Sequence, residues 1–167
     1  VLLKDAAQVE ELKSEIEAEG LLLIKTFGDD NHRATPVLEG MTLQTAEHSY
    51  YVSGNNGAVM EALRGLFLDC DAALGGHDLK RAYYALMAEG FSVQNHPAAF
   101  DTAIGQYLLQ PSRSSYELDV IAMEAGISQL PSEQEFLAQT GQMTLFSDPG
   151  ETNGAYGQLW CSVSEAV

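Results

Sequence analysis

The sequence predicts an α/β fold with a mixed β-sheet and helices on its faces, and three observations lead to that prediction. The chain opens with one helical pattern and three extended segments, and after residue 54 helical patterns alternate with short extended ones. Hydrophobic residues make up 46% of the chain, which is enough for a real core. With 167 residues and no internal repeat, the chain is expected to form a single domain over residues 1–167.

The first third of the chain predicts a helix followed by an antiparallel meander. Asp5 is placed to cap a helix with apolar residues at helical spacing, and Gly20 is placed to end it. The apolar run 21–27 is typical of a buried strand. Residues 37–45 and 48–52, which are rich in Thr and Tyr, predict two further strands joined by a tight connection.

Alternating elements are predicted over the rest of the chain. A short strand is expected at 72–74, followed by a loop at Gly75-Gly76, and an extended segment at 91–93. Helices are expected with apolar faces made by Val59, Leu63 and Leu66; by Leu79, Tyr83, Leu86 and Met87; by Ile104, Tyr107 and Leu108; by Leu118, Ile121, Ala122 and Ala125; and by Tyr156, Leu159 and Val163. The pattern weakens over 127–150, which is expected to be irregular apart from a short helix at 132–138.

The charge balance limits the partners of the chain. Acidic residues outnumber basic ones by 24 to 8, which gives a net charge of −16. Contacts to phosphates need Lys and Arg, so this chain is not expected to bind nucleic acid or an anionic membrane by itself. No apolar run is long enough to span a membrane, and no signal peptide is visible. Cys70 and Cys161 are therefore expected to be free thiols in a reducing cytoplasm.

Several familiar motifs of catalysis and binding do not occur in this sequence. The nucleophile elbow G-x-S-x-G and the phosphate-binding glycine motifs are absent, so the glycines at 54–57 and 75–76 are interpreted as loops. The histidines and cysteines lack the spacing of zinc ligands. The two thiols are expected to be unreactive. A structural or surface role is expected for all four histidines, His32, His48, His77 and His96.

Acidic residues near element ends are the strongest candidates for chemistry. Two-metal phosphodiester hydrolysis needs about four carboxylates that converge on ions about 4 Å apart. Asp29 and Asp30 follow the first predicted strand, where metal carboxylates often lie. Asp78, Asp101 and Asp119 begin or line helices. The alternative interpretation, which the pattern favours, is that Asp78 and Asp101 cap helices and that Asp119 lies on a solvated face.

Two segments carry a family resemblance. Residues 100–119 read F-D-T-A-I-G-Q-Y-L-L-Q-P-S-R-S-S-Y-E-L-D, and residues 76–82 read G-H-D-L-K-R-A. The first resembles the F-D-T…Y-L-L-x-P-S-R-S-x-Y-x-L-D stretch of the 3′–5′ exonuclease domain of bacterial DNA polymerase I, a family A polymerase. The second is similar to that family's G-x-N-L-K-Y-D segment. The resemblance implies a ribonuclease H-like fold, with a mixed five-stranded sheet flanked by helices.

The resemblance also implies which residues active members use, and this sequence departs from them. In active members a D-x-E on the first strand, the Asp that closes N-L-K-Y-D and a Y-x-x-x-D on a late helix hold two divalent metals. The residues expected at these positions are Ile24-Lys25-Thr26 for D-x-E, Ala82 for the second-motif Asp, and Gly150 and Gly154 for the Tyr and Asp. Neither Ile nor Ala has an oxygen side-chain ligand, and hard cations need several. We therefore expect no metal, no other cofactor and no catalytic residue in this domain.

The resemblance implies that the parent protein is a DNA-directed DNA polymerase of replication and repair in the cytoplasm. This domain is then expected to be a vestigial, structural module that precedes the polymerase domain of the same chain. It is expected to meet DNA only through that parent. Ile24 should point into the core, and Ala82 should cover a space too small for two metals. Two alternatives remain open: an active two-metal exonuclease with displaced ligands, and a free-standing interaction domain on the same fold.

Overall fold

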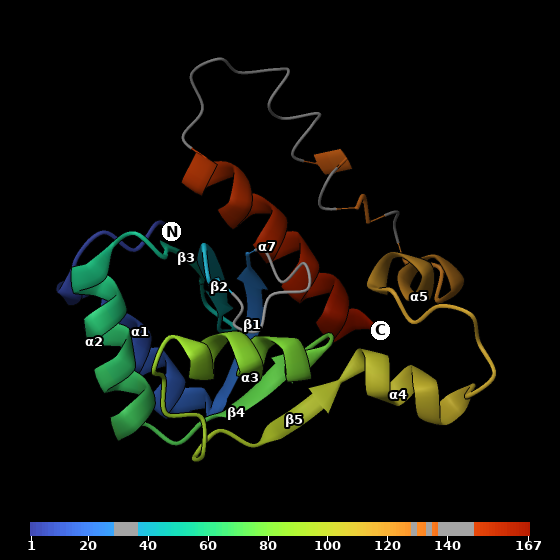
Figure 1. The fold of residues 1–167 in the computed structure, drawn as a ribbon, viewed down its shortest axis with the longest axis horizontal. Helices are drawn as coiled ribbons and strands as arrows, with labels where there is room; N and C mark the ends of the chain where they lie inside the picture. The colour runs from blue at the N-terminus through green and yellow to red at the C-terminus, as the bar shows by residue number, and fades with distance from the viewer. Residues whose placement is uncertain (29–36, 128–129, 133–134, 137–148) are drawn as a thin grey trace.

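The computed structural model describes residues 1–28, 37–127, 130–132, 135–136 and 149–167, and it confirms a mixed five-stranded sheet. The strand order is β3-β2-β1-β4-β5, with β1–β3 as an antiparallel meander and β4 and β5 parallel to β1 (Figure 1). The strands are β1 Leu21–Phe27, β2 Gly40–Gln44, β3 Ser49–Ser53, β4 Ala73–Gly76 and β5 Ala98–Asp101. The helices are α1 Ala6–Glu19, α2 Gly57–Asp69, α3 Leu79–Ala88, α4 Thr102–Leu109, α5 Leu118–Glu124 and α7 Pro149–Ala166.

Two hydrophobic cores lie on opposite faces of the sheet, because successive side chains of a strand point to opposite sides. In β1, Leu22 and Ile24 pack with α1, α2 and α3, whereas Leu23 and Phe27 pack with α5 and α7. The helices thus cover both faces of the sheet (Figure 1). None of the described helices is both long enough and apolar enough to cross a membrane.

The first helix is fixed by local signals, as the sequence predicts. The Asp5 side chain accepts hydrogen bonds from the N–H groups of Ala7 and Gln8 at 3.0 and 3.1 Å. Gly20 ends the helix with a positive φ of 69°, a backbone conformation that glycine adopts without steric cost.

Strands β4 and β5, at the edge of the sheet opposite β3, differ from the prediction. Gly75 and Gly76 belong to β4 and do not form a loop. A side chain at Gly75 would place its Cβ 2.5 Å from the Phe100 ring of β5, so glycine is needed for close packing between neighbouring strands. The predicted extended segment at 91–93 is not a strand. Strand β5 follows it instead, and the sequence pattern did not predict this strand.

Two helices present different faces from those predicted. In α3 the buried residues include Ala82 and Ala85, whereas Met87 is 53% exposed. In α4 no residue is buried at all, although its apolar residues were expected to face the core. Most of the segment 127–150, including four of the seven residues of the expected helix at 132–138, lies outside the described residues.

One carboxylate caps two helices at the junction of β5 and α4. Asp101 accepts hydrogen bonds from Ala103 and Ile104 at the start of α4, and from Asp78 and Leu79 at the start of α3. The Asp78 side chain makes no such cap, and its backbone lies in the left-handed region at φ 53°. The capping role predicted for Asp101 is therefore confirmed, and the one predicted for Asp78 is wrong.

Replacing Asp101 with alanine is expected to lower the free energy of unfolding by about 2 kcal/mol, because each lost cap costs about 1 kcal/mol. Urea unfolding followed by circular dichroism measures this change. The matched control is Asp78→Asn, which keeps a residue that tolerates a positive φ and should change stability by less than about 0.5 kcal/mol. Equal effects of the two substitutions would contradict the double cap.

Candidate functional site

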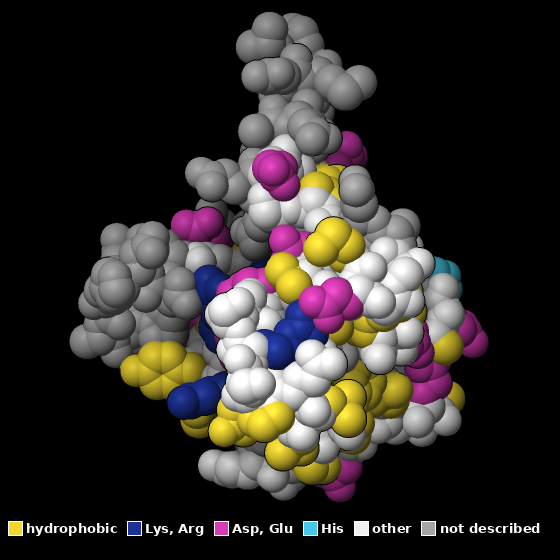
Figure 2. Space-filling model, turned by 90° about the vertical axis from the view of Figure 1, so that its right-hand side faces the viewer, with side chains coloured by type: hydrophobic (Ala, Val, Ile, Leu, Met, Phe, Trp, Pro, Cys, Tyr) yellow, Lys and Arg dark blue, Asp and Glu magenta, His cyan; other side chains and the backbone are white. Residues whose placement is uncertain are grey.

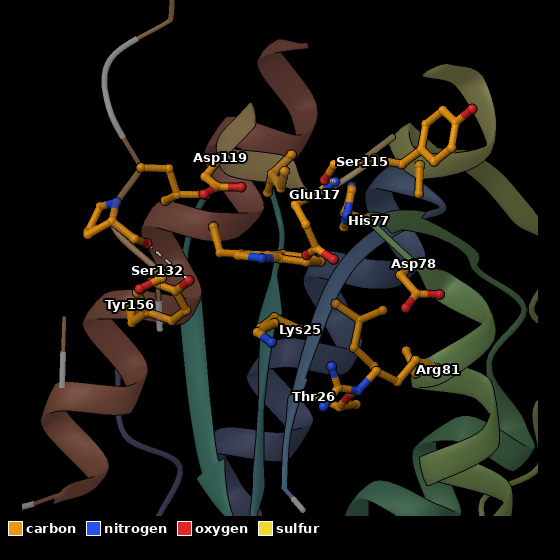
Figure 3. A pocket seen from close by; sticks show the side chains of 18 of the residues that line it. Lys25, Thr26, His77, Asp78, Arg81, Ser115, Glu117, Asp119, Ser132 and Tyr156 are labelled. Atoms are coloured by element: carbon orange, nitrogen blue, oxygen red, sulfur yellow. Dashed lines mark hydrogen bonds between the residues drawn. The ribbon is translucent and has the colours of Figure 1, made fainter. Parts of the chain in front are cut away.

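A cavity of about 650 Å³ opens between β1 and the helices α3, α5 and α7. Figure 3 shows side chains from all four elements pointing toward this cleft. The residues that line it include Ile24, Lys25, Thr26, His77, Asp78, Arg81, Ala82, Glu117, Asp119, Tyr156 and Trp160. The cleft therefore brings together the first-strand and second-motif positions singled out in the sequence.

Lys25 projects from β1 into this cleft, beneath the α7 side chains (Figure 3). Its ammonium nitrogen lies 5.1 Å from the centroid of the Trp160 ring and 5.2 Å from that of Phe27. Both separations suit attraction between a cation and the face of an aromatic ring. A positive charge thus stands on the strand that carries acidic ligands in active members of the family.

The α7 residues that face the cleft are Tyr156 and Trp160, in place of the predicted Gly150 and Gly154. Gly154 lies against the sheet, where a Cβ would be 3.0 Å from the Cβ of Tyr51. The rotation of the helix therefore turns Gly154 away from the cleft. Tyr156 and Trp160 are four residues apart, the spacing of the family's Y-x-x-x-D, with an indole where that motif has its Asp.

The packing of β1 shows which of its residues face the late helix. The side chains of β1 that pack toward α7 include Leu23 and Phe27, and Lys25 lies between them on the same face. On the face of β1 that packs toward α7, Lys25 and Phe27 have the two-residue spacing of D-x-E, while the placement of that motif on Ile24 and Thr26 stays a prediction. Neither Lys25 nor Phe27 offers an oxygen ligand.

The two packing predictions have different outcomes. Ile24 is 1% exposed and belongs to the core that also contains Ala82, so its predicted orientation is confirmed. The cavity that Ala82 lines measures about 650 Å³ as a whole, so the size of the space beside Ala82 stays a prediction. The available volume therefore does not distinguish this cleft from a metal site, and only the chemistry of the lining can.

The acidic residues that the structure describes in the cleft do not gather into a set of metal ligands. Asp78 lies at the start of α3, whereas Glu117 and Asp119 lie at the start of α5. Among the described residues, the only group of three possible ligands with atoms within 4.8 Å of one another is elsewhere, at Glu15, Glu47 and His48. The donors described in the cleft thus do not fit a pair of divalent cations. Asp29 and Asp30, the other candidates, lie outside the described residues.

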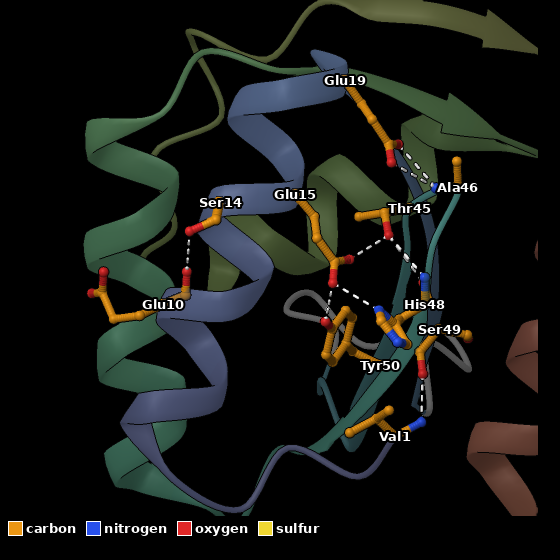
Figure 4. A network of polar contacts seen from close by, with 10 residues as sticks. All are labelled: Val1, Glu10, Ser14, Glu15, Glu19, Thr45, Ala46, His48, Ser49 and Tyr50. Carbon is orange, nitrogen blue, oxygen red and sulfur yellow. Dashed lines mark hydrogen bonds and ion pairs between the residues drawn. The ribbon is translucent and has the colours of Figure 1, made fainter.

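The group around Glu15 is a structural network (Figure 4). Oε2 of Glu15 accepts a hydrogen bond from the Thr45 hydroxyl, and Oε1 accepts one from the Tyr50 hydroxyl, both at 2.6 Å. Nδ1 of His48 lies 2.7 Å from Oε1. Because protein donors already occupy both oxygens, this carboxylate links α1 to the β2–β3 hairpin.

The other histidines that the structure describes have structural roles, as predicted. The two thiols are also structural. His77 lines the cleft with Nδ1 2.7 Å from the Thr102 hydroxyl, and burial lowers its pKa, so the ring is neutral at pH 7. Both ring nitrogens of the buried His96 lie 2.9 Å from backbone carbonyl oxygens. Burial raises the pKa of the Cys161 thiol to about 12 and also raises that of Cys70, which leaves both thiols unreactive. His32 lies outside the described residues.

Comparison with known proteins agrees with this geometry. A family model described as the ribonuclease H-like domain of DNA polymerase I matches residues 22–145. The chain belongs to this family. A search of curated proteins found no match.

Solved structures show the same fold at low sequence identity. The POL domain of Pol1 from M. smegmatis, in complex with DNA primer-template and dNTP, is 17% identical with a TM-score of 0.65. That match covers 99% of this chain and 26% of the Pol1 chain. Escherichia coli RNase D is 12% identical with a TM-score of 0.68, covering 98% of this chain and 41% of that one. The complex of Trypanosoma brucei RNase D with GMP is 10% identical, with a TM-score of 0.70 and coverage of 99% and 55%.

Sequence reasoning missed several residues of the cleft, three of which carry a charge or a large ring. Arg81, Glu117 and Trp160 line the cleft but were not singled out. For Trp160 a signal was present, because Tyr156 and Trp160 repeat the tyrosine and the spacing of the late-helix motif. The other two depend on how α3 and α5 approach the sheet, which no local pattern records.

Proposed function

We propose that this chain is a catalytically inactive, exonuclease-like domain of a DNA polymerase I, and that it serves its parent as a structural module. The observation that carries the proposal is the lining of the cleft. Lys25, Ala82 and Trp160 line it, and the resemblance places the carboxylates of active members at or beside these positions. The parent would perform DNA synthesis in replication and repair, in the cytoplasm, through a polymerase domain that is not part of this chain.

The physical basis is the loss of metal ligands. A hard divalent cation is bound by several oxygen atoms, and its charge activates the attacking water and stabilises the leaving oxygen. Ala82 and Trp160 supply no such oxygen, and the fixed positive charge of Lys25 repels a cation at close range. Loss of most ligands is therefore expected to abolish metal-dependent hydrolysis.

The decisive experiment is a pair of measurements on the parent protein. Calorimetric titration with Mn²⁺ should show no saturable binding in the micromolar range to this domain. Incubation with single-stranded DNA and Mn²⁺, in the absence of dNTPs, should release no nucleotides from the 3′ end. Metal-dependent release of nucleotides would favour the alternative of an active exonuclease whose ligands come from elsewhere in the chain.

Restoring one carboxylate is not expected to restore activity. The variant Ala82→Asp supplies a single oxygen ligand group, whereas two-metal hydrolysis needs about four. Cleavage of single-stranded DNA by this variant should stay at the level of the unchanged parent, which is its control. Measurable Mn²⁺-dependent cleavage by Ala82→Asp alone would mean that the other ligands are already present.

The length of the native reading frame tests the second part of the proposal. A parent with a polymerase domain after this one supports the structural role. A parent without a polymerase domain favours the alternative of a free-standing interaction domain.

A further inference from the structure

Helix α4 exposes a set of large apolar side chains, which we call the α4 face. Its members Ile104, Tyr107, Leu108 and Leu109 are 56%, 53%, 74% and 78% exposed. Figure 2, which looks at the side of the molecule that carries α4 and α5, shows hydrophobic side chains gathered over its lower part. Contiguous apolar surface of this kind is typical of an interaction site.

The composition of α4 sets it apart from every other described helix. Its eight residues include no charged side chain, in a chain with a net charge of −16. None of the eight is buried. An isolated helix of this length is marginal in water, and most helical stability in proteins comes from packing of an apolar face. The Asp101 cap holds one end, and the Tyr107 ring meets the Tyr116 ring edge to face at 5.7 Å between centroids, yet the four apolar side chains stay more than half exposed.

A groove extends the α4 face toward the carboxyl end of α7. This second cavity, of about 300 Å³, is lined by residues that include Phe100, Leu109, Ile121 and Val167. Figure 1 shows the end of α7 beside α4 and α5. A domain that follows α7 in the same polypeptide therefore starts next to the α4 face.

We infer that the α4 face is the surface against which the polymerase domain of the parent chain packs. This inference rests on the proposed function, which places such a domain after α7. Two observations favour the polymerase domain over a separate partner. The groove beside the α4 face reaches the end of α7, from which a following domain would start. In the Pol1 chain the matching fold covers only 26% of the length, so most of that polypeptide lies outside this fold. Packing removes the apolar side chains from water and supports α4.

Hydroxyl-radical footprinting of the intact parent tests the inference with an internal control. Tyr107 on α4 and Tyr84 on α3 are both 53% exposed in this structure, so with no further domain against either ring the two should be oxidised at similar rates. Packing of the polymerase domain should slow oxidation of Tyr107 several-fold relative to Tyr84. Equal oxidation of the two rings in the intact parent would overturn the inference.

A pair of variants separates packing of the polymerase domain from other causes of protection. In the parent carrying Leu108→Glu and Leu109→Glu, oxidation of Tyr107 should rise to the rate of Tyr84, because charged side chains cannot be buried there without a partner. Leu68, which is 63% exposed on α2, provides the matched control, and Leu68→Glu should leave the protection unchanged. Protection that disappears on dilution of the unchanged parent would assign the α4 face to a second copy and overturn the inference.

Failure of this inference is distinguishable from failure of the proposed function. A parent that contains a polymerase domain, cuts no DNA and leaves Tyr107 unprotected refutes only the inferred surface. A parent that releases nucleotides by this domain while Tyr107 is protected refutes only the proposed inactivity. A parent without a polymerase domain overturns both.

Discussion

Replacing Glu15 with alanine is expected to lower the free energy of unfolding by about 4 kcal/mol. The Glu15 side chain is 8% exposed and holds three donors, from Thr45, His48 and Tyr50. Its removal leaves the buried hydroxyl of Tyr50 without its acceptor and opens a cavity beneath α1. Urea unfolding of the purified chain measures the change.

The control for this prediction is Glu10, which lies earlier on the same helix. Glu10 is exposed, and Glu10→Ala should change stability by less than about 0.5 kcal/mol. Tyr50→Phe removes one donor and keeps the ring, so it should cost about 1–2 kcal/mol. If Glu15→Ala is no more destabilising than Glu10→Ala, the network does not hold α1 to the hairpin.

The same network predicts how stability depends on pH. Burial raises the pKa of Glu15, but the hydrogen bonds from Thr45, Tyr50 and His48 and the charge of His48 together lower it below its ordinary value of 4.5. Its contribution is therefore complete above pH 4.5 and is lost as the pH falls through the folded-state pKa. Burial, together with the Glu15 carboxylate, raises the pKa of Tyr50 above its ordinary value of 10.0. That contribution is complete below pH 10.0 and is lost as the pH rises.

Unfolding experiments across the pH range test these two signs. The unchanged chain should lose stability at both the acidic and the alkaline end. Glu15→Ala should weaken both dependences, whereas Tyr50→Phe should weaken the alkaline one most. An alkaline dependence that is identical in the unchanged chain and in Tyr50→Phe would contradict the assignment to Tyr50.

Replacing Gly157 with alanine is expected to cost about 3 kcal/mol of stability. A Cβ at this position would lie 1.9 Å from Oγ1 and 2.6 Å from Cβ of Thr42, which is fully buried on β2. Neither atom is the mobile end of a long side chain, so α7 has to move away from the sheet. The melting temperature should fall by about 6–12 °C in differential scanning calorimetry.

A second glycine provides the matched control. Gly65 lies within α2, and nothing lies within 4 Å of the Cβ that an alanine would add. Gly65→Ala should therefore raise stability by about 0.5–1 kcal/mol, because alanine restricts the unfolded chain and favours the helix. A neutral or stabilising Gly157→Ala would show that α7 does not rest on β2 through this residue.

Close contact between α7 and the sheet also determines the candidate site. Gly154 and Gly157 face Tyr51 and Thr42, so the helix is turned with Tyr156 and Trp160 toward the cleft. This rotation turns Gly154, the predicted position of the late-helix Asp, toward the sheet and away from the cleft. The sequence contains both possible registers, and only the packing of a helix against a particular strand chooses between them.

Neighbouring residues alone were enough to predict the elements whose causes are local. Asp5 and Gly20 define α1 because capping and a positive φ involve only neighbouring residues. The meander and the two-sided core follow from apolar runs and from alternation along β1. The family followed mainly from the long stretch at residues 100–119, supported by residues 76–82, because a long ordered motif rarely recurs by chance.

Tertiary structure alone decided the features that depend on distant partners. Strand β5 exists because it pairs with β4, although Ala98 and Ala99 are exposed and show no strand pattern. Asp101 caps α3 as well as α4 because the sheet brings their ends together, across more than twenty residues of chain. Apolar periodicity identified α4 but did not reveal that its apolar side faces solvent, since a period specifies a stripe on the helix and not what lies against it.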